Sequence, residues 1–216
     1  MTVIKKIEGG REYRSLQMDA AENDEMTVEG YATTFDEPYH LYFFDDDKGN
    51  TKEVFEQVDR NAFRSADLSD VIFQYDHEGK VYARLSNGTL ELSEDDHGLK
   101  VRANLGGTKA GQELYEEIKG GYTNKMSFGF TVADDDIKAL EDGNYLRTIR
   151  KVGKLYDVSA VSYPQNNYTE ISARAHCDGV IAEIEAERLQ AEMEKAERES
   201  KRENLVKRLS EVRRSE

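Results

Sequence analysis

Cysteine and long hydrophobic runs are what this sequence has least of. Its 216 residues include a single cysteine, Cys177, which excludes an internal disulfide framework and suits a reducing compartment. No apolar run approaches the roughly 20 residues that a membrane-spanning helix needs, and the amino-terminal residues lack the apolar core of a secretory signal. We therefore expect a protein that is soluble and cytoplasmic when it is synthesised, without a membrane partner.

Positive charge is also in short supply. The chain has 30 lysine and arginine residues against 44 aspartate and glutamate residues, so its net charge is -14 at pH 7. Surfaces that bind nucleic acid without sequence preference are basic, and this composition therefore argues against a nucleic-acid partner. The four histidines and one cysteine show no metal-ligand spacing, and no glycine-rich nucleotide-binding motif is present. We expect neither a metal nor another cofactor.

Residues 1–172 carry the two-residue periodicity of β-strands. Short runs rich in β-branched and aromatic residues alternate with turn signals, of which Asn87-Gly88 predicts a hairpin. About eight strands are expected, including an edge strand over residues 12–18 and two successive strands over residues 145–152 and 154–161. This pattern predicts a mainly β (α+β) domain in the form of a closed or nearly closed β-barrel.

Three stretches interrupt the strand pattern. Residues 59–64 predict a short helix that begins at a cap formed by Asp59. Residues 113–119 predict a second short helix with one apolar side, ended by two glycines. The acidic stretch over residues 134–142 predicts an exposed loop or a helical turn. We expect the two short helices to flank the barrel.

The carboxy-terminal residues have the composition of one long charged helix. Residues 180–212 contain no proline or glycine, and pairs such as Glu194 and Arg198 lie four apart with the acid first. Apolar residues are expected only at the two ends of this range, the second group within residues 205–212, and the middle is interpreted as polar on all sides. We treat residues 173–216 as a separate helical tail. Self-association through coiled-coil pairing at its ends and a solvated tail without a role both remain open.

The strand over residues 125–132 is the feature around which we build a candidate site. Its apolar side chains share one face, which leaves Ser127 on the other face with Gly129 beside it. A serine on a rigid strand can act as a nucleophile if a neighbouring base accepts its proton. The best candidate base is His77, at the end of the strand predicted over residues 71–77, because histidine changes protonation near neutral pH. We expect these two strands to be neighbours.

Two further residues are candidates for the site, and every candidate also has a non-catalytic interpretation. Lys125 shares a face with Ser127 and could act as the base of a serine–lysine pair, but the two lie roughly 6.5–7 Å apart along the strand. Lys125 could instead hold substrate carboxylates or stay solvated. Asp157 interrupts an apolar strand and needs a partner if it is buried. On pattern alone, a surface serine, a packed histidine and an exposed aspartate are the commoner outcomes.

Several short segments occur in a fixed order with characteristic spacings over roughly residues 28–164. They are Gly30–Phe35, Ala62–Phe63, Asp76–Glu78, Gly88–Leu92, Gly98–Val101, Met126–Phe130 and Asp157–Pro164. As an ordered set, they resemble the prohead maturation proteases of tailed bacteriophages, a family similar in fold to the herpesvirus assemblins. The resemblance implies an assemblin-like β-barrel serine endopeptidase. It would cleave capsid or scaffold proteins, and commonly itself, inside the immature capsid in the host cytoplasm.

The resemblance also implies residue roles. The family's histidine falls on His77 and its serine on Ser127, and Asp157 stands where an acidic residue is usual. The chain departs from the family at Asp76, where an asparagine is frequent, so this carboxylate competes for the third role. His97 is a further alternative, because assemblins use a second histidine as the third member, although the residues around His97 predict a turn. We predict that Ser127 is the nucleophile, His77 the base and Asp157 the acid that orients it.

Three functional hypotheses follow. The first is the endopeptidase, with a C-terminal helix that recruits it into the assembling shell or is removed as a scaffold-like segment. The second is a non-enzymatic scaffolding protein whose β domain binds capsid subunits. The third, a serine hydrolase that acts on a small-molecule ester, is the least favoured.

Overall fold

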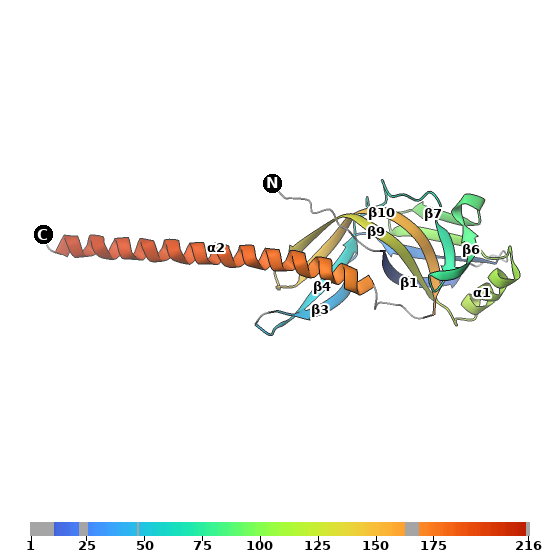
Figure 1. Ribbon diagram of the computed structural model, residues 1–216, viewed down its shortest axis with the longest axis horizontal. Helices are drawn as coiled ribbons and strands as arrows, with labels where there is room; N and C mark the ends of the chain where they lie inside the picture. Colours follow the sequence, from blue (N-terminus) through green and yellow to red (C-terminus); the bar gives the residue numbers. More distant parts are fainter. Residues whose placement is uncertain (1–10, 22–25, 47, 163–168, 215–216) are drawn as a thin grey trace. The chain divides into compact units, whose positions relative to one another are not determined.

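A computed structural model gives the fold, and it describes residues 11–21, 26–46, 48–162 and 169–214 (Figure 1). The chain divides into two compact units, Met1–His176 and Cys177–Glu216. The elements in chain order are β1 Glu12–Ala20, β2 Thr27–Thr34, β3 Tyr39–Asp45, β4 Thr51–Val58, β5 Ile72–Tyr75, β6 Glu78–Arg84, the 3-10 helix η1 Leu85–Asn87, β7 Leu90–Glu94, β8 Gly98–Asn104, α1 Lys109–Lys119, β9 Lys125–Ala139, β10 Tyr145–Val161 and α2 Thr169–Arg214. The prediction of a mainly β fold with a long C-terminal helix is confirmed. The predicted boundary between residues 172 and 173 stays a prediction.

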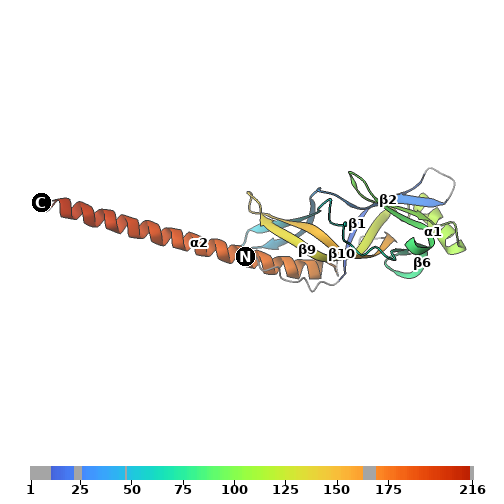
Figure 2. The ribbon, with the colours of Figure 1, turned by 90° about the horizontal axis from the view of Figure 1, so that it is seen from above.

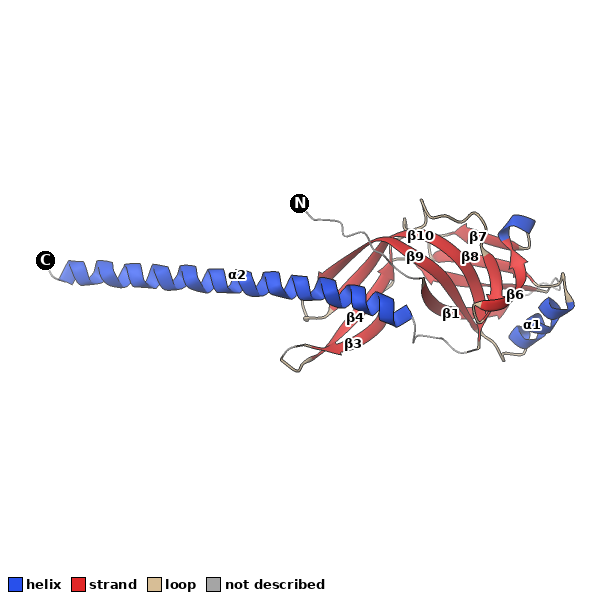
Figure 3. Ribbon diagram, viewed as in Figure 1, coloured by secondary structure: helices blue, strands red, loops and turns tan. Residues whose placement is uncertain are grey.

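The strands form one curled, mixed sheet with the order β3-β4-β10-β9-β1-β2-β8-β7, and β5 joins β10 on the side that β4 also uses. Both β4 and β5 run parallel to β10, the first along residues 145–149 and the second along residues 157–160. The curl is visible from two sides in Figure 1 and Figure 2, and Figure 3 separates the strands from the helices. The sheet is a half-barrel, because among the described strands its order ends at β3 and β7 without joining them.

Strand β1 lies inside the sheet, so the prediction of an edge strand over residues 12–18 is wrong. It pairs with β2 through residues 18–20 and with β9 through residues 12–17. One face of β1, which includes Glu12 and Met18, is buried and mixes charged with apolar side chains, whereas Gln17 and Asp19 on the other face are exposed. Charged side chains on one of these faces are buried with partners of opposite charge from other strands. A single-sequence pattern cannot show such partners.

The long hairpin of β9 and β10 also differs from the prediction. The acidic stretch predicted as a loop continues β9 to residue 139, because arginines on β10 pair with its aspartates across the strands. The two strands predicted over residues 145–161 are one strand, and Gly153 lies within a register shift rather than in a break. The predicted strand end at Tyr163-Pro164 lies outside the described residues.

Three local elements differ in smaller ways. Residues 59–64 form hydrogen-bonded turns and not the predicted helix. Asn87-Gly88 ends η1 and does not make a hairpin, because β7 pairs with β8. Helix α1 begins four residues earlier than predicted, since the Thr108 hydroxyl accepts a hydrogen bond from the backbone N–H of Gly111 and caps the first turn.

The core supports the candidate strand on both faces. Met126, Phe128 and Phe130 are fully buried on one face of β9, and the two phenylalanine rings stack with centroids 4.6 Å apart. Ser127 on the opposite face is only 2% exposed. The serine therefore lies in a covered environment, and its strand is held by packed side chains.

A buried cluster of charged side chains, the arginine–carboxylate network, lies among β1, β4, β9 and β10. Arg147 is fully buried and donates hydrogen bonds to Glu12 at 2.8 Å, to Glu56 at 2.7 Å and to Asp135 at 2.7 Å. Arg14 donates to Glu56 at 2.6 Å. Charges that leave water must be paired and hydrogen-bonded to be tolerated. The network therefore links four strands through buried charges, and separating these charges would cost free energy.

The network fixes the protonation of its carboxylates. Burial acts to raise the pKa of Glu56, but the guanidinium groups of Arg14 and Arg147 outweigh it and the pKa is lowered. The same competition lowers the pKa of Asp135, where a hydrogen bond from His176 at 3.1 Å joins the contact with Arg147. Both carboxylates are therefore ionised in the folded chain at neutral pH.

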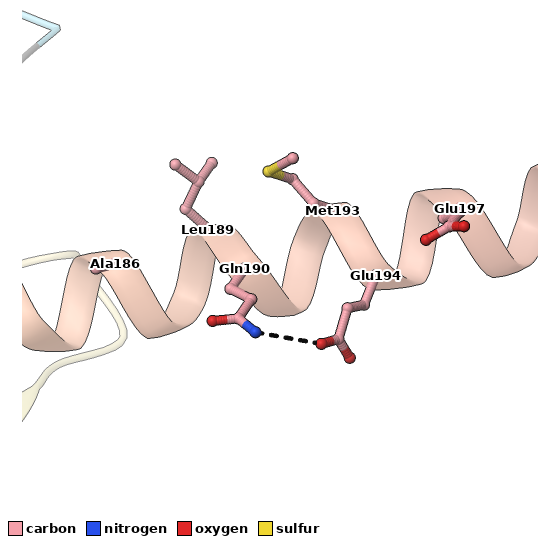
Figure 4. A pocket seen from close by; sticks show the side chains of 6 residues that line it. All are labelled: Ala186, Leu189, Gln190, Met193, Glu194 and Glu197. Carbon is pink, nitrogen blue, oxygen red and sulfur yellow. Dashed lines mark hydrogen bonds between the residues drawn. The ribbon is translucent and has the colours of Figure 1, made fainter.

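The second unit consists of helix α2 from residue 177 onward. Its ion pairs at four-residue spacing include Glu194 with Arg198 at 3.6 Å. The middle of the helix is not polar on all sides as predicted, because Leu189 and Met193 are 60% and 66% exposed and lie side by side (Figure 4). Side chains of residues 205–212 lie outside the described part of the chain. None of the described helices has the length and apolar character that crossing a membrane requires.

Candidate active site

Three side chains from three separate elements meet beside β10. Ser127 lies near the start of β9, Asp157 lies in β10, and His77 lies in the turn between β5 and β6. β10 pairs antiparallel with β9 and parallel with β5, so it lies between the strands that carry the other two residues. The prediction that these two strands are direct neighbours is therefore wrong. His77 reaches Ser127 because it projects from the end of β5.

The turn that carries His77 has an unusual backbone. The paired residues Tyr75 and Glu78 enclose only Asp76 and His77, whose φ angles are +48° and +61°. Positive φ at both central positions is typical of the type I′ turn that joins two hairpin strands. Histidine and aspartate enter this left-handed region more readily than most residues, at a cost of about 1–2 kcal/mol. The tight turn fixes the direction in which the imidazole leaves the backbone.

The imidazole bridges the other two side chains. His77 Nε2 lies 2.7 Å from Ser127 Oγ, and His77 Nδ1 is hydrogen-bonded to Asp157 Oδ1. An ionised carboxylate can only accept, so Nδ1 carries the proton and Nε2 of the neutral ring accepts from the serine hydroxyl. Asp157 is 1% exposed, and the His77 side chain is 14% exposed. The arrangement can draw a proton from the serine oxygen and stabilise the resulting imidazolium.

Three further side chains contact this arrangement, and none of them was predicted from the sequence. Ser159 donates a hydrogen bond to Asp157 Oδ1 at 3.0 Å. The ring of Tyr13 packs against the His77 ring with centroids 4.1 Å apart. Arg11 Nη1 lies 3.6 Å from Asp157 Oδ2, a buried oxygen that accepts no hydrogen bond from any described residue. Ser159 could have been found from its spacing of two from Asp157, which puts both on one strand face. For Arg11 and Tyr13, no pattern in the neighbouring sequence indicates a contact with Asp157 or His77.

Gly129 makes room for the site. It pairs with Tyr13 of β1 on one side and with Asp157 of β10 on the other. A Cβ atom at this position would lie 2.5 Å from Asp157 Oδ2 and 2.7 Å from the Tyr13 ring. Only glycine lets the aspartate and the tyrosine approach the imidazole together at this point.

Gly129→Ala should therefore lower activity without unfolding the chain. The methyl group would displace Asp157 or Tyr13 by about 1 Å, and misplacement of that size in an active site costs roughly 100-fold in rate. The measurement is the initial rate of peptide cleavage together with the thermal unfolding midpoint. Gly107→Ala is the matched control, because a Cβ there meets nothing within 4 Å. A folded Gly129→Ala protein with the wild-type rate would contradict the prediction.

The alternative site residues engage other partners. The carboxylate of Asp76 accepts hydrogen bonds from the Ser162 backbone N–H at 3.1 Å and from its hydroxyl at 3.0 Å. His97 lies in the turn between β7 and β8, where its ring makes an edge contact with Tyr31 at 4.5 Å. Lys125 is half-buried at the first position of β9. The structure thus brings together His77, Ser127 and Asp157, and their catalytic roles stay predictions.

Metal ligation has no support in the described part of the chain. Within these residues, no group of three or more histidine, cysteine, aspartate or glutamate side chains is arranged to hold a metal ion.

Comparison with known proteins points to one family. A family model described as Caudovirus prohead serine protease matches residues 14–180, a range that contains all three site residues. The prohead protease of Enterobacteria phage HK97 is 32% identical over 90 residues, which cover 41% of this chain and 39% of that protein. The match to this relative therefore spans well under half of either chain. No solved structure matches the chain.

Proposed function

Because the chain belongs to the caudovirus prohead serine protease family, we propose that it is a serine endopeptidase that cleaves capsid or scaffold proteins while a tailed-phage head matures. The observation that carries this proposal is the hydrogen-bonded series from Ser127 through His77 to Asp157. The proposed place of action is the interior of the immature capsid in the host cytoplasm. Cleavage of the chain by itself is part of the same proposal.

The geometry suggests a separate chemical role for each of the three groups. Ser127 Oγ attacks the carbonyl carbon of the scissile peptide bond while His77 Nε2 accepts its proton. The tetrahedral intermediate breaks its bond to nitrogen, and the imidazolium gives the proton to the leaving amine. A water molecule then attacks the acyl-enzyme with His77 again as base, which releases the second product and restores the serine. Asp157 keeps the imidazole in the required tautomer and stabilises its charged form.

The burial of the Asp157 side chain supports these roles. The Asp157 carboxylate is almost completely removed from water, so its attraction for an imidazolium is weakened less by solvent than at an exposed site. Ser159 holds one carboxylate oxygen, and Tyr13 covers one face of the imidazole ring. A base that is held in this way needs little reorganisation when the proton moves.

Co-expression with the major capsid protein of the phage that encodes this chain tests the proposal. Mass spectrometry of the assembled particles should find a shortened capsid or scaffold protein with the wild-type chain. It should find the intact protein with Ser127→Ala. Ser162→Ala is the matched control, since this serine is exposed and its hydroxyl contacts Asp76. Normal particles with uncut proteins in every case would instead favour the non-enzymatic scaffolding protein.

A further inference from the structure

Helix α2 carries a narrow apolar stripe along its exposed middle, which we call the α2 seam. Its members follow one another at alternating spacings of four and three residues, and they are Ala182, Ala186, Leu189, Met193 and Ala196. Leu189 and Met193 stand 60% and 66% exposed, and their side chains project from the same side of the helix (Figure 4). The spacing is that of the a and d positions of a heptad repeat, which form the contact line between paired helices. At the next position, Ser200, the stripe becomes polar.

The charges on the helix are distributed unevenly around this seam. The six e and g positions that border it contain five glutamates and one glutamine, and they are Glu183, Glu185, Gln190, Glu192, Glu197 and Glu199. The basic residues of the same stretch lie at b, c and f positions, and they are Arg188, Lys195, Arg198, Lys201 and Arg202. The two borders of the seam therefore carry a single sign of charge. This arrangement goes beyond what solubility requires, since a solvated helix can place its basic residues at any exposed position.

Ion pairs within the helix do not remove this asymmetry. Glu192 pairs with Arg188 at 3.3 Å and Glu197 with Lys201 at 2.5 Å, and all four side chains are more than 60% exposed. Exposed pairs at four-residue spacing contribute little to stability and are weakened further by salt. The glutamates can therefore exchange these pairs for contacts across a helix–helix interface.

A second copy of this chain is a poor occupant of the seam. In a parallel pair, g residues such as Glu192 face e residues such as Glu197 of the other helix. In an antiparallel pair, g faces g and e faces e, so glutamates again oppose one another. Like charges in these positions work against pairing. The occupant that fits must carry the opposite charge at its own e and g positions.

We propose that α2 residues 182–200 form a docking surface for an amphipathic helix of a partner protein, whose apolar seam is bordered by lysine or arginine. The alanines let the partner backbone approach closely, and Leu189 and Met193 provide the two bulky contacts. Methionine adapts its shape to the side chains that it meets. The net charge of -14 adds long-range attraction for a basic partner. Binding at this surface does not involve Ser127 and does not require cleavage.

Two matched synthetic peptides test the proposal with the full chain. Both are about four heptads long with leucine at a and d, and they carry either lysine or glutamate at every e and g position. Fluorescence anisotropy at physiological salt should show binding of the lysine peptide only. The double variant Leu189→Gln/Met193→Gln should weaken this binding at least about tenfold, because it removes the buried apolar contacts without a change in charge. Ala191→Gln, at an f position on the opposite side, is the matched control and should bind as the wild type does.

Three results would overturn the proposal. Equal affinity of the wild type and the double variant would mean that the peptide responds to overall charge alone. Failure of the lysine peptide to bind would remove the docking surface. Sedimentation equilibrium of the chain alone that shows a dimer, which the double variant dissociates, would make a second copy the occupant. Glutamine is a good helix former, so circular dichroism should show that α2 is retained in every variant.

Discussion

Ser127→Ala should reduce peptide cleavage by about 10³–10⁶-fold, and His77→Ala should reduce it by a similar factor. The expectation rests on the 2.7 Å contact between Ser127 Oγ and His77 Nε2. Without the hydroxyl there is no nucleophile, and without the imidazole the hydroxyl keeps its proton. Since the two groups act as a unit, the double variant should be only slightly slower than either single variant.

Purified proteins and a peptide taken from a mapped cleavage site give the required rates. An organophosphorus reagent should label the wild-type chain on Ser127 and leave both variants unlabelled. His97→Ala is the control for loss of a histidine, since that ring contacts Tyr31 in another turn. Comparison of Asp157→Asn with Asp76→Asn separates the two carboxylates, and only the first should be slow. Retention of a tenth of the wild-type rate by Ser127→Ala would end the proposed mechanism.

Arg147→Ala should destabilise the fold by about 3–5 kcal/mol, the usual cost of breaking a buried ion pair from one side. The substitution leaves Glu12, Glu56 and Asp135 buried without the guanidinium that donates to all three. It also leaves a cavity at a side chain with no exposed surface. Urea unfolding at neutral pH, followed by circular dichroism, measures the change in the free energy of unfolding.

Arg150→Ala is the matched control for this loss. Arg150 lies on the same strand and pairs with Asp134 at 3.3 Å, but its side chain is 48% exposed. Exposed pairs contribute roughly 0–1 kcal/mol, so this variant should unfold nearly as the wild type does. Equal stability of the two variants would show that the network does not hold the strands together.

Local patterns predicted the elements whose causes are local. The alternation around Ser127 predicted β9, and the run of helix-forming residues predicted α2, because each depends on residues close in sequence. The acidic end of β9 was predicted wrongly, since its pairing with Arg147 depends on a residue 12 positions away from Asp135. Strand β1 was taken for an edge for a similar reason. Its buried charges find partners on strands that follow much later in the chain.

In the candidate site too, features with local causes were predicted, and contacts between distant residues were missed. The ordered segments led to Ser127, His77 and Asp157, but the strand pattern put His77 at the end of a strand. Periodicity reports which face a residue occupies, and it carries no information about a two-residue turn with positive φ. Tyr13 could not be found from the sequence, because its contact with His77 depends on how β1 crosses the sheet. The sequence pattern placed Gly129 beside the serine, but it did not indicate the close approach of Asp157 and Tyr13 to this glycine.

The large sequence separations within the site have a consequence for synthesis of the chain. Asp157 is 80 residues from His77, and Ser127 is 50 residues from it. A ribosome must therefore release most of the first unit before the imidazole can meet its carboxylate. A chain that ends before Asp157 contains the serine and the imidazole, but it lacks the carboxylate that orients the imidazole and strand β10, which pairs with both β5 and β9. The proposed peptidase activity therefore cannot arise until most of the first unit has been translated. Neighbouring nascent polypeptides are not cleaved before then, and no inhibitor is needed.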